Sequence, residues 1–442
     1  AVDSDKLFAT YLVPTEDESD SEMLANLYMV RSEDGGKTFL DPVQVNGNDG
    51  EASDGGYVVP ARFGSNDEVY VLWEYVEPHP QFWGIGELRL AKSTDGGRTF
   101  GSTVDPAANE PLSEKYYGEL AVSNSGTIMA AYINNEFVTL DSSNGTQIVY
   151  NTDSVDYVIQ MILLRSDDGG KTFDKVVLDE DACQCCDNVS TVGPDGEIYY
   201  AWRSSDRDVA QKNDFSDKYI STYGNRTKGQ EYEWSDDAGK AAYDQGLIDF
   251  PTEYSTARDI VVAHTTDGGK GLKWSEPVRV QEKMWMYNGC PSIGAGMQFD
   301  STGRLHVTYF TGAGADGKIG YYHVYSDDKG KTFSEPKPVF SADFIADTHT
   351  NTDLTIDKND NLWVSFVTFE EAGSTESDWE KLHEMGKTLH VYVIDRQGNI
   401  IDNEAFSSGS ISSPSSASTK EGTFISYSDD EGAKIVSLAL GA

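Results

Sequence analysis

The stretch RSEDGGKTF, from Arg31 to Phe39, recurs with small changes along this chain of 442 residues. Related copies begin at Lys92 (KSTDGGRTF), Arg165 (RSDDGGKTF) and Tyr325 (YSDDKGKTF), and a fifth at His264 (HTTDGGKGLKW) has two extra residues before its aromatic. In the shared pattern S/T-x-D-x-G-x-T-F, the Asp side chain bonds nearby backbone N–H groups and Gly adopts a conformation costly for other residues. Thr and Phe then re-enter a strand. The pattern therefore predicts the same tight turn in each copy.

The copies lie about 60 to 100 residues apart, which is the length of one four-stranded antiparallel sheet with its loops. Strand-like runs surround each copy in a constant order. Around the copy at Tyr325 they are residues 292–300, 304–312, 318–326 and 331–340, and around the copy at Arg165 they are 118–126, 127–135, 157–166 and 171–179. No long amphipathic helical periodicity competes with them. We therefore expect an all-β chain of repeated sheets.

These turns and their spacing resemble the Asp-box (BNR repeat) β-propellers, a family that includes the sialidases. The resemblance covers nearly the whole chain and implies a single domain over residues 1–442, with a long insertion at about 204–258. It favours six four-stranded blades, with seven as the alternative, and a ring closed by the N- and C-terminal strands, which would remove exposed sheet edges. In this family the boxes lie on the outer rim, so their Asp residues are expected to be structural.

The resemblance to sialidases can be tested on their arginine clamp, in which three inner-strand arginines bind the substrate carboxylate. Arginine suits that task because its planar fork makes two parallel hydrogen bonds to a carboxylate. Among the expected inner strands only Arg62, in VVPARFGS, is a candidate, and the Arg-Ile-Pro signature is absent. A conventional sialidase is therefore not the expected function, although glycosidases that use two carboxylates remain open.

The charge balance restricts the partners. The chain has 74 acidic and 34 basic residues, a formal net charge of −40, so its field would repel nucleic acid and anionic membranes. No apolar run approaches the roughly 20 residues that span a bilayer. The start at AVDSDKLF and three glycosylation sequons, at Asn144, Asn188 and Asn225, suggest an exported mature chain. We expect an extracellular or cell-surface protein.

The cysteines are concentrated in one place. Three of the four, Cys183, Cys185 and Cys186, lie in ACQCCDN, and the fourth is Cys290 in NGCPSIG. When the units are aligned on the hairpins PDGEIYYAW and STGRLHVTYF, Cys183 falls level with Cys290, one step before the innermost strand. The same register puts Asp347 level with Cys183, His349 level with Cys185, and Asp54 at the same height. A ring of these side chains around the axis is therefore predicted.

Three interpretations of the cysteines stay open, and one of them, beside the two that follow, is free or reactive thiols. In an exported protein the first is disulfides, either Cys183–Cys290 or a bridge from Cys185 or Cys186 to Cys290 with the remaining two paired locally. The second is a copper or zinc site, because thiolates with His349 offer soft ligands, although the spacing is not that of a paired C-x-x-C zinc knuckle.

Two further features are candidates for ligand contact. His79 lies on a Pro- and aromatic-rich loop, EPHPQFWG, that favours a packed loop but is also suited to a binding rim. The insertion at about 204–258 is polar and is either a recognition element or a solvated decoration. Its carboxylates are suited to calcium, yet it contains no regular calcium loop.

Together these observations predict binding of carbohydrate, or of a surface protein, at the axial face, where the loops of every blade converge. Arg62, His79, Asp54 and Asp347 are the candidate ligand-binding residues. Two alternatives are an enzyme, either a glycoside hydrolase or a copper or zinc catalyst at the cysteines, and a self-assembling component of a surface layer or filament. The sequence favours binding over catalysis.

Overall fold

The structure of the protein is a computed structural model. It describes residues 5–15, 24–47, 52–53, 60–64, 66–79, 82–111, 113–142, 145–150, 159–183, 186–206, 224–225, 233–234, 256–282, 285–287, 293–342, 345, 351–369, 386–411 and 414–440. Within these ranges every regular element is a strand, and no helix is long and apolar enough to cross a membrane.

The first half of the chain forms four antiparallel sheets. The first contains β1 (Leu7–Pro14), β2 (Leu24–Ser32), β3 (Val43–Gln44) and β4 (Ala52–Ser53). The second contains β5 (Ala61–Phe63), β6 (Val69–His79) and β7 (Phe82–Ser93). The third contains β8 (Ser113–Val122), β9 (Ile128–Ser142), β10 (Gly145–Tyr150), β11 (Ile159–Ser166) and β12 (Asp174–Asp179). The fourth contains β13 (Val189–Val192), β14 (Ile198–Asp206), β17 (Thr256–His264), β18 (Val278–Arg279) and β19 (Trp285–Tyr287).

The second half adds three sheets of the same kind. The fifth contains β20 (Ala295–Phe299), β21 (Leu305–Thr311), β22 (Ile319–Ser326) and β23 (Lys337–Ala342). The sixth contains β24 (Asp353–Ile356), β25 (Leu362–Phe369), β26 (Lys387–Ile394) and β27 (Ile400–Ser408). The seventh contains β28 (Ser415–Ser418), β29 (Thr423–Asp429) and β30 (Gly432–Leu438). A two-strand pair of β15 (Gly224–Asn225) and β16 (Glu233–Trp234) lies between β14 and β17.

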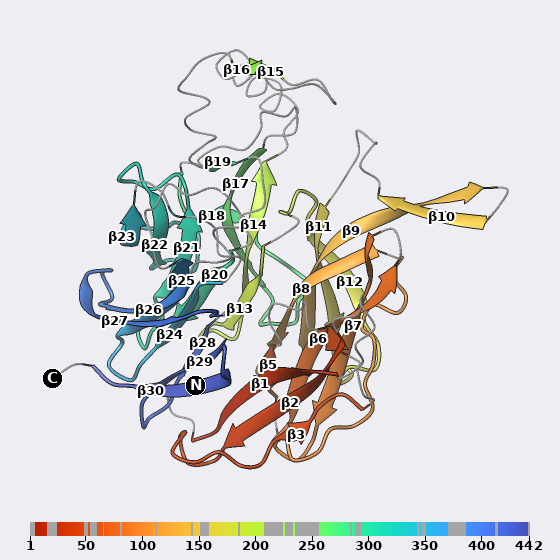
Figure 1. Cartoon of the computed structure of the whole chain (residues 1–442), viewed down its shortest axis with the longest axis horizontal. Helices are drawn as coiled ribbons and strands as arrows, with labels where there is room; N and C mark the ends of the chain where they lie inside the picture. Colours follow the sequence, from red (N-terminus) through yellow and green to blue (C-terminus); the bar gives the residue numbers. More distant parts are fainter. Residues whose placement is uncertain are drawn as a thin grey trace.

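The sheets follow one another around the molecule in chain order, from red through yellow and green to blue (Figure 1). The leading strands are neighbours: β5 contacts β8, β8 contacts β13, β13 contacts β20, β20 contacts β24, and β24 contacts β28. Each leading strand therefore lies toward a common centre, with its partners stacked outward. This arrangement is an all-β propeller, as the repeats predicted.

The number of blades is seven, which was the alternative to the favoured six. The prediction that both chain ends share one closing sheet is not seen among the described residues. Instead β1 pairs with β2, and β30 pairs with β29 from Thr423↔Leu438 to Asp429↔Gly432. The C-terminal residues therefore make their own hairpin rather than offering an edge to the N-terminus.

The recurring turns have one hydrogen-bond pattern, seen first after β2. The Asp34 carboxylate accepts from the Thr38 backbone N–H (2.9 Å) and from the Thr38 hydroxyl (2.7 Å), while the Ser32 hydroxyl accepts from the Gly36 N–H (2.8 Å). These hydrogen bonds, above all that from the Thr38 backbone, lower the pKa of Asp34 to about 2. The same bonds recur after β7, β11 and β22, around Asp95, Asp168 and Asp328.

The copy after β17 is built differently. Asp267 accepts backbone N–H bonds from four consecutive residues, Lys270 to Lys273. The Thr265 hydroxyl donates to Glu197, from the β13–β14 turn of the same blade, and Glu197 also accepts from the N–H groups of Gly268 and Gly269. Glu197 therefore supplies acceptors that the interrupted turn lacks.

Each turn packs against the blade before it. A Cβ atom placed on Gly97 would lie 2.4 Å from Met29 of the first blade, and one on Gly271 would lie 2.2 Å from Met129 of the third. In the first blade, a Cβ on Gly36 would lie 2.3 Å from the ring of Phe424 in the seventh. Because the turn of the first blade meets the seventh, this contact links the two ends of the chain.

Other contacts support the link between the first and seventh blades. The Thr419 hydroxyl donates to the Gly35 carbonyl (3.0 Å), and Lys37 forms an ion pair with Glu421 (2.9 Å).

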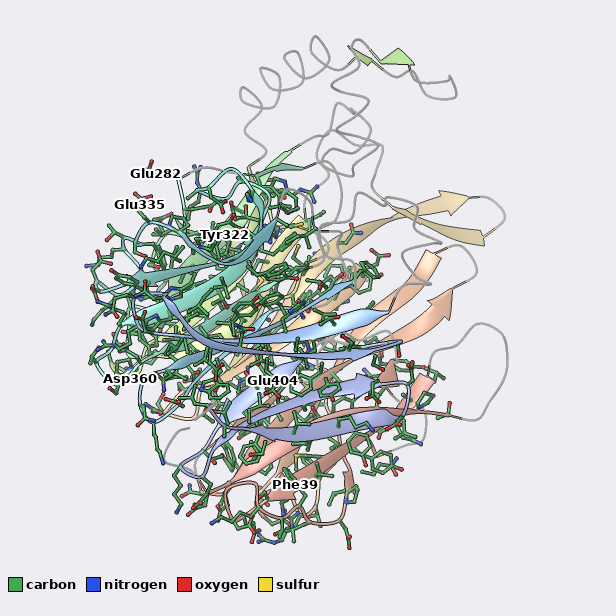
Figure 2. The ribbon with its side chains drawn as sticks, turned by 60° about the vertical axis from the view of Figure 1, so that its left-hand side comes forward. Phe39, Glu282, Tyr322, Glu335, Asp360 and Glu404 are labelled. Atoms are coloured by element: carbon green, nitrogen blue, oxygen red, sulfur yellow. The ribbon has the colours of Figure 1, made fainter. Side chains whose placement is uncertain are left out.

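Large side chains on both faces of each sheet exclude water from the space between neighbouring blades. Every residue of β21 and of β25 is buried, because each of these second strands lies between two neighbouring sheets. Figure 2 shows Tyr322 in the interior of the fifth blade, where its hydroxyl donates to Asp316 (2.5 Å), and Glu404 on the outermost strand of the sixth.

Gly36→Ala tests the packing of the turns. Gly36 has φ +93° and faces the Phe424 ring, whereas Gly126 has φ +87° and no atom within 4 Å of the position a Cβ would take. Both Ala variants acquire backbone strain of about 1–2 kcal/mol, and Gly36→Ala alone adds an overpacking cost of about 1–3 kcal/mol. Chemical denaturation should therefore show a clearly larger loss of unfolding free energy for Gly36→Ala. Equal losses would mean that the contact with Phe424 does not matter.

Candidate functional site

Four neighbouring blades meet just before or within their innermost strands. Tyr117 lies in β8, Asp187 precedes β13, Gly294 precedes β20, and Asn351 precedes β24. The Gly294 N–H donates to the Asn351 Oδ1 (3.0 Å), and a Cβ on Gly294 would lie 2.6 Å from the Asp187 carbonyl oxygen. The Asn188 Nδ2 donates to the Tyr117 carbonyl (2.9 Å), which joins the third and fourth blades. Asp187, Gly294 and Asn351 each lie four residues after a position that the sequence alignment placed in the axial ring, and the ring itself stays a prediction.

A backbone irregularity shapes the junction in the third blade. The register of β8 against β9 shifts between Tyr116 and Glu119, and Tyr117 has φ +57°. This is an uncommon conformation for an aromatic residue, and it is stored at a cost of roughly 1–3 kcal/mol. The shift turns the Gly118 N–H toward the Glu74 carboxylate, to which it donates (2.8 Å). The strained backbone therefore provides a hydrogen-bond donor to a buried carboxylate.

Three buried carboxylates converge here, and we call Glu74, Glu119 and Asp187 the axial acid cluster. Glu74 comes from β6, Glu119 from β8, and Asp187 from the segment before β13, so three different blades contribute. All three residues are at least nine-tenths buried. Burial raises the pKa of Glu74 to about 7, against the opposing backbone hydrogen bonds from Gly118 and Tyr117.

Glu119 is the member of the cluster with a cationic partner. The Arg62 guanidinium and the Ser190 hydroxyl both donate to its Oε1 (2.5 Å each). Burial raises the pKa of Glu119, and the positive charge of Arg62 opposes the rise. Arg62 also acts electrostatically on Asp353, a buried acid of the sixth blade. The predicted ligand-binding residue Arg62 therefore lies among the carboxylates, and its Nη1 and Nη2 already donate to the Ala61 carbonyl and to Glu119.

Asp187 has neither a cation nor a backbone donor at its carboxylate among the described residues. Burial raises the pKa of Asp187 well above its usual range, and the negative charges of Glu74 and Glu119 raise it further. Its Oδ2 is buried and, within the described part of the chain, has no hydrogen-bond partner. A buried polar atom without a partner is costly, so Asp187 is the member best placed to meet a ligand. The cluster thus combines an acid whose pKa is raised, Asp187, with a carboxylate whose charge is balanced by Arg62.

Two of the cysteines lie next to the cluster. Cys183 and Cys186 are buried thiols, with their sulfur atoms 3.5 Å apart. The side chains of the other predicted site residues, Cys185, Cys290, His349, Asp54, Asp347 and His79, lie outside the described residues. The pairing of Cys183 with Cys290 therefore stays a prediction, as does ligand binding by the remainder.

Metal binding and glycosylation also stay predictions. Among the described side chains, no group of three or more His, Cys, Asp or Glu residues is arranged to hold a metal ion. Of the three sequons, only the Asn188 side chain is described. It is buried, and its Nδ2 is engaged with Tyr117, so a glycan on that nitrogen would have to break this bond.

Sequence reasoning missed all three members of the cluster. With 74 acidic residues in the chain, three more carboxylates carry no signal on their own. One signal was present: Asp187 follows Cys186 directly and lies four residues after Cys183, the position predicted to face the axis. Glu74 could not be found in this way, since it comes from the second strand of its blade and is brought in by the shift in β8.

Comparisons with known proteins give structural neighbours only. They include a protein of unknown function from Dyadobacter fermentans (13% identity, 87% of this chain and 95% of that chain, TM-score 0.48). A leech intramolecular trans-sialidase matches at 11% identity over 92% of this chain and 71% of that one, with a TM-score of 0.49. A GH93 α-L-arabinofuranosidase of Fusarium graminearum matches at 12% identity over 89% and 96%, with a TM-score of 0.45. No protein-family model or curated protein matches the sequence. At these TM-scores we take neither substrate nor mechanism from the neighbours.

Glu74→Gln tests whether burial holds a proton on Glu74. Because the pKa of Glu74 is raised in the folded state, the folded protein binds more protons than the unfolded chain between about pH 4.5 and 7. Glu74 therefore stabilises the fold less as the pH rises through this window. Glutamine keeps an acceptor for the Gly118 N–H but carries no charge.

At pH 8 the Gln variant should be more stable than the parent, by about 1–3 kcal/mol, and at pH 4.5 the difference should nearly vanish. Urea denaturation at both pH values measures it. A variant that is equally destabilised at both would show that Glu74 is not a strained acid.

Proposed function

We propose that the protein hydrolyses glycosidic bonds at the axial acid cluster. The observation that carries the proposal is Asp187: a buried carboxyl group whose Oδ2 lacks a partner among the described residues, beside two other buried carboxylates. Glycoside hydrolysis needs one carboxylic acid that gives a proton to the leaving oxygen, and one carboxylate that acts as base or nucleophile. Of the functions predicted from the sequence, this is the alternative to simple carbohydrate binding.

The three acids have different surroundings, and these differences assign the roles of proton donor and of base or nucleophile. Burial, together with the charges of Glu74 and Glu119, raises the pKa of Asp187 well above its usual range and so favours its protonated form. Glu119 is the carboxylate whose charge is balanced, by Arg62. Pairs of acids whose surroundings push their pKa values apart are the pattern of acid–base chemistry near neutral pH. Asp187 is therefore the proposed proton donor and Glu119 the proposed base or nucleophile.

Glu74 is a positioning residue in this scheme. Its carboxylate accepts a hydrogen bond from the Gly118 backbone N–H and thereby holds the strained segment of β8. Its charge also contributes to the raised pKa of Asp187. Loss of Glu74 should therefore change the pH at which Asp187 keeps its proton, beyond any effect on the rate.

The charge of the site favours a neutral or cationic sugar. Arg62 is the sole arginine on the described leading strands, and Glu119 already balances it. An anionic sugar would meet three acids and a chain of net charge −40. The same acidic exterior supports a place outside the cell, with an extracellular glycan as the partner.

The test uses 4-methylumbelliferyl glycosides of neutral sugars, of glucosamine and of glucuronic acid. We expect turnover of a neutral or amino sugar, and Asp187→Asn should lower kcat by about 10²- to 10⁴-fold. Glu74→Gln should move the alkaline limb of the pH profile to lower pH, because Asp187 loses the neighbouring charge that raises its pKa. Glu404→Gln, on the exposed outer strand β27, is the matched control and should behave as the parent.

Two results would overturn the proposal. One is glycan binding on an array with no turnover of any glycoside, which would return the function to binding. The other is turnover that Asp187→Asn leaves intact in a variant with unchanged unfolding free energy, which would place the chemistry elsewhere.

A further inference from the structure

The two described cysteines form a close thiol pair on the segment that leads into the axial acid cluster. The segment is anchored before them, since the Ala182 N–H donates to the Ile159 carbonyl (2.9 Å) and the Cys183 N–H to the Arg203 carbonyl (2.8 Å). Both thiols are 1% exposed. With Sγ atoms 3.5 Å apart, a modest movement brings them to bonding distance, and no blade has to shift.

The hydrogen bonds give the two sulfurs different characters. The Cys186 thiol donates to the Cys183 Sγ, and the Arg258 Nη1 donates to the same sulfur (3.3 Å). The Cys183 sulfur therefore accepts twice, once from a cation, as a thiolate does. Burial raises the pKa of Cys186 well above its usual value, and its bond to Cys183 adds to the rise, so Cys186 keeps its proton.

The buried Arg203 adds positive charge around the pair. Its Nη2 donates to the carbonyls of Ile293 (3.1 Å) and Phe310 (2.8 Å), and Asp259 lies 3.8 Å from its Nη1. The charges of Cys183 and Cys186 both act on this guanidinium. The interaction of Arg203 with Cys186 is larger than that with Cys183, so this cation favours negative charge on either sulfur. Arg258 of β17, which donates to the Cys183 Sγ, is the cation that distinguishes Cys183 from Cys186. The pair is thus arranged as one attacking sulfur and one resolving sulfur.

We propose that Cys183 and Cys186 are a dithiol that small-molecule disulfides oxidise to an intramolecular disulfide. The Cys183 thiolate attacks one sulfur of the reagent, whose S–S bond breaks and releases a thiolate. Cys186 gives its proton to that leaving group, and its sulfur then attacks the Cys183 Sγ, which releases the second half of the reagent as a thiolate. One protein thiolate, one protein thiol and one reagent disulfide become one protein disulfide, one reagent thiol and one reagent thiolate. Among the pairings that the sequence left open, this one is local.

The oxidation state of the pair reaches the site through the chain. Asp187 follows Cys186 directly in the chain. The next residue, Asn188, is held in place by the hydrogen bond from its Nδ2 to the Tyr117 carbonyl. Closure of the disulfide therefore restrains the backbone on the N-terminal side of the proposed proton donor. This consequence for activity rests on the proposed function, whereas the thiol chemistry does not.

The experiment uses the full chain with Cys185→Ser and Cys290→Ser, so that only the two thiols of interest remain. The protein is reduced, equilibrated in glutathione buffers of increasing oxidised fraction, and alkylated under denaturing conditions. We expect two alkylated thiols in the reducing buffer, none in the oxidising buffer, and a Cys183–Cys186 link by tandem mass spectrometry. In a variant that also carries Cys186→Ser, we expect the Cys183 thiol to form a mixed disulfide with glutathione instead of a disulfide within the protein.

Arg258→Gln keeps both thiols and should slow oxidation by about tenfold, because less of the attacking sulfur is ionised. Arg98→Gln, on an exposed turn of the second blade, is its control and should not change the rate. Peptide mapping of the unsubstituted chain guards against misfolding of the Ser variants. Two free thiols at every buffer composition, or Cys183 and Cys186 each linked to Cys185 or Cys290 in the unsubstituted chain, would overturn the proposal.

The activity readout is separate. If the proposed function holds, kcat should differ between the oxidised and reduced forms and should not respond to the buffer in the Cys186→Ser background beyond the effect of the glutathione adduct. A protein with no glycosidase activity would remove the proposed function and leave the thiol result standing.

Discussion

The packing of each Asp turn on the blade before it is the contact on which the architecture depends. The hydrogen bonds around Asp34 fix the turn, but they act within nine residues of sequence and cannot by themselves position a sheet. In the first, second and fourth blades the glycine in the turn does so, because its missing Cβ lets the backbone rest on a side chain of the neighbouring blade, while Gly170 and Gly330 lie at ordinary contact distance from theirs. Repeated around the molecule, this contact sets the spacing of the sheets. The leading strands are consequently brought together at the centre.

The axial acid cluster is a consequence of that convergence, and it is held against an electrostatic cost. Three carboxylates in a dry junction repel one another, and proton uptake is the way to relieve them unless a cation is available. One cation, Arg62, is present among the described residues, and it serves Glu119. The remaining strain falls on Asp187 and Glu74, and on the backbone of Tyr117. A protein with no use for these groups would be more stable with glutamine or an apolar residue in their place.

The repeats, through their resemblance to Asp-box proteins, sufficed to predict an all-β propeller. Each copy contains the turn residues and the aromatic that begins the next strand, and strand-like runs surround it in the same order. They did not settle the number of blades, since β28 to β30 lack a complete turn pattern and only their self-pairing makes them a separate sheet. Cys183 does precede the leading strand β13, as counting back from a hairpin glycine predicted, whereas its place in an axial ring stays a prediction. The roles of Glu74 and Tyr117 could not be predicted from the sequence, because the segment YYGEL contains no pattern that indicates a shift in strand register. The roles that the sequence assigns to Cys183 and Cys186 stay predictions, and only the distance between their sulfur atoms distinguishes the local pair from other pairings.

The interrupted turn of the fourth blade shows how such a chain diverges after duplication. There Glu197, some seventy residues upstream, accepts from Thr265, Gly268 and Gly269, and thereby replaces bonds that the other copies make internally. The fourth copy and its hairpin have become mutually dependent, so neither can be exchanged with its counterpart from another unit. The fourth unit therefore folds as one piece with its hairpin, although it has the same outline as its neighbours.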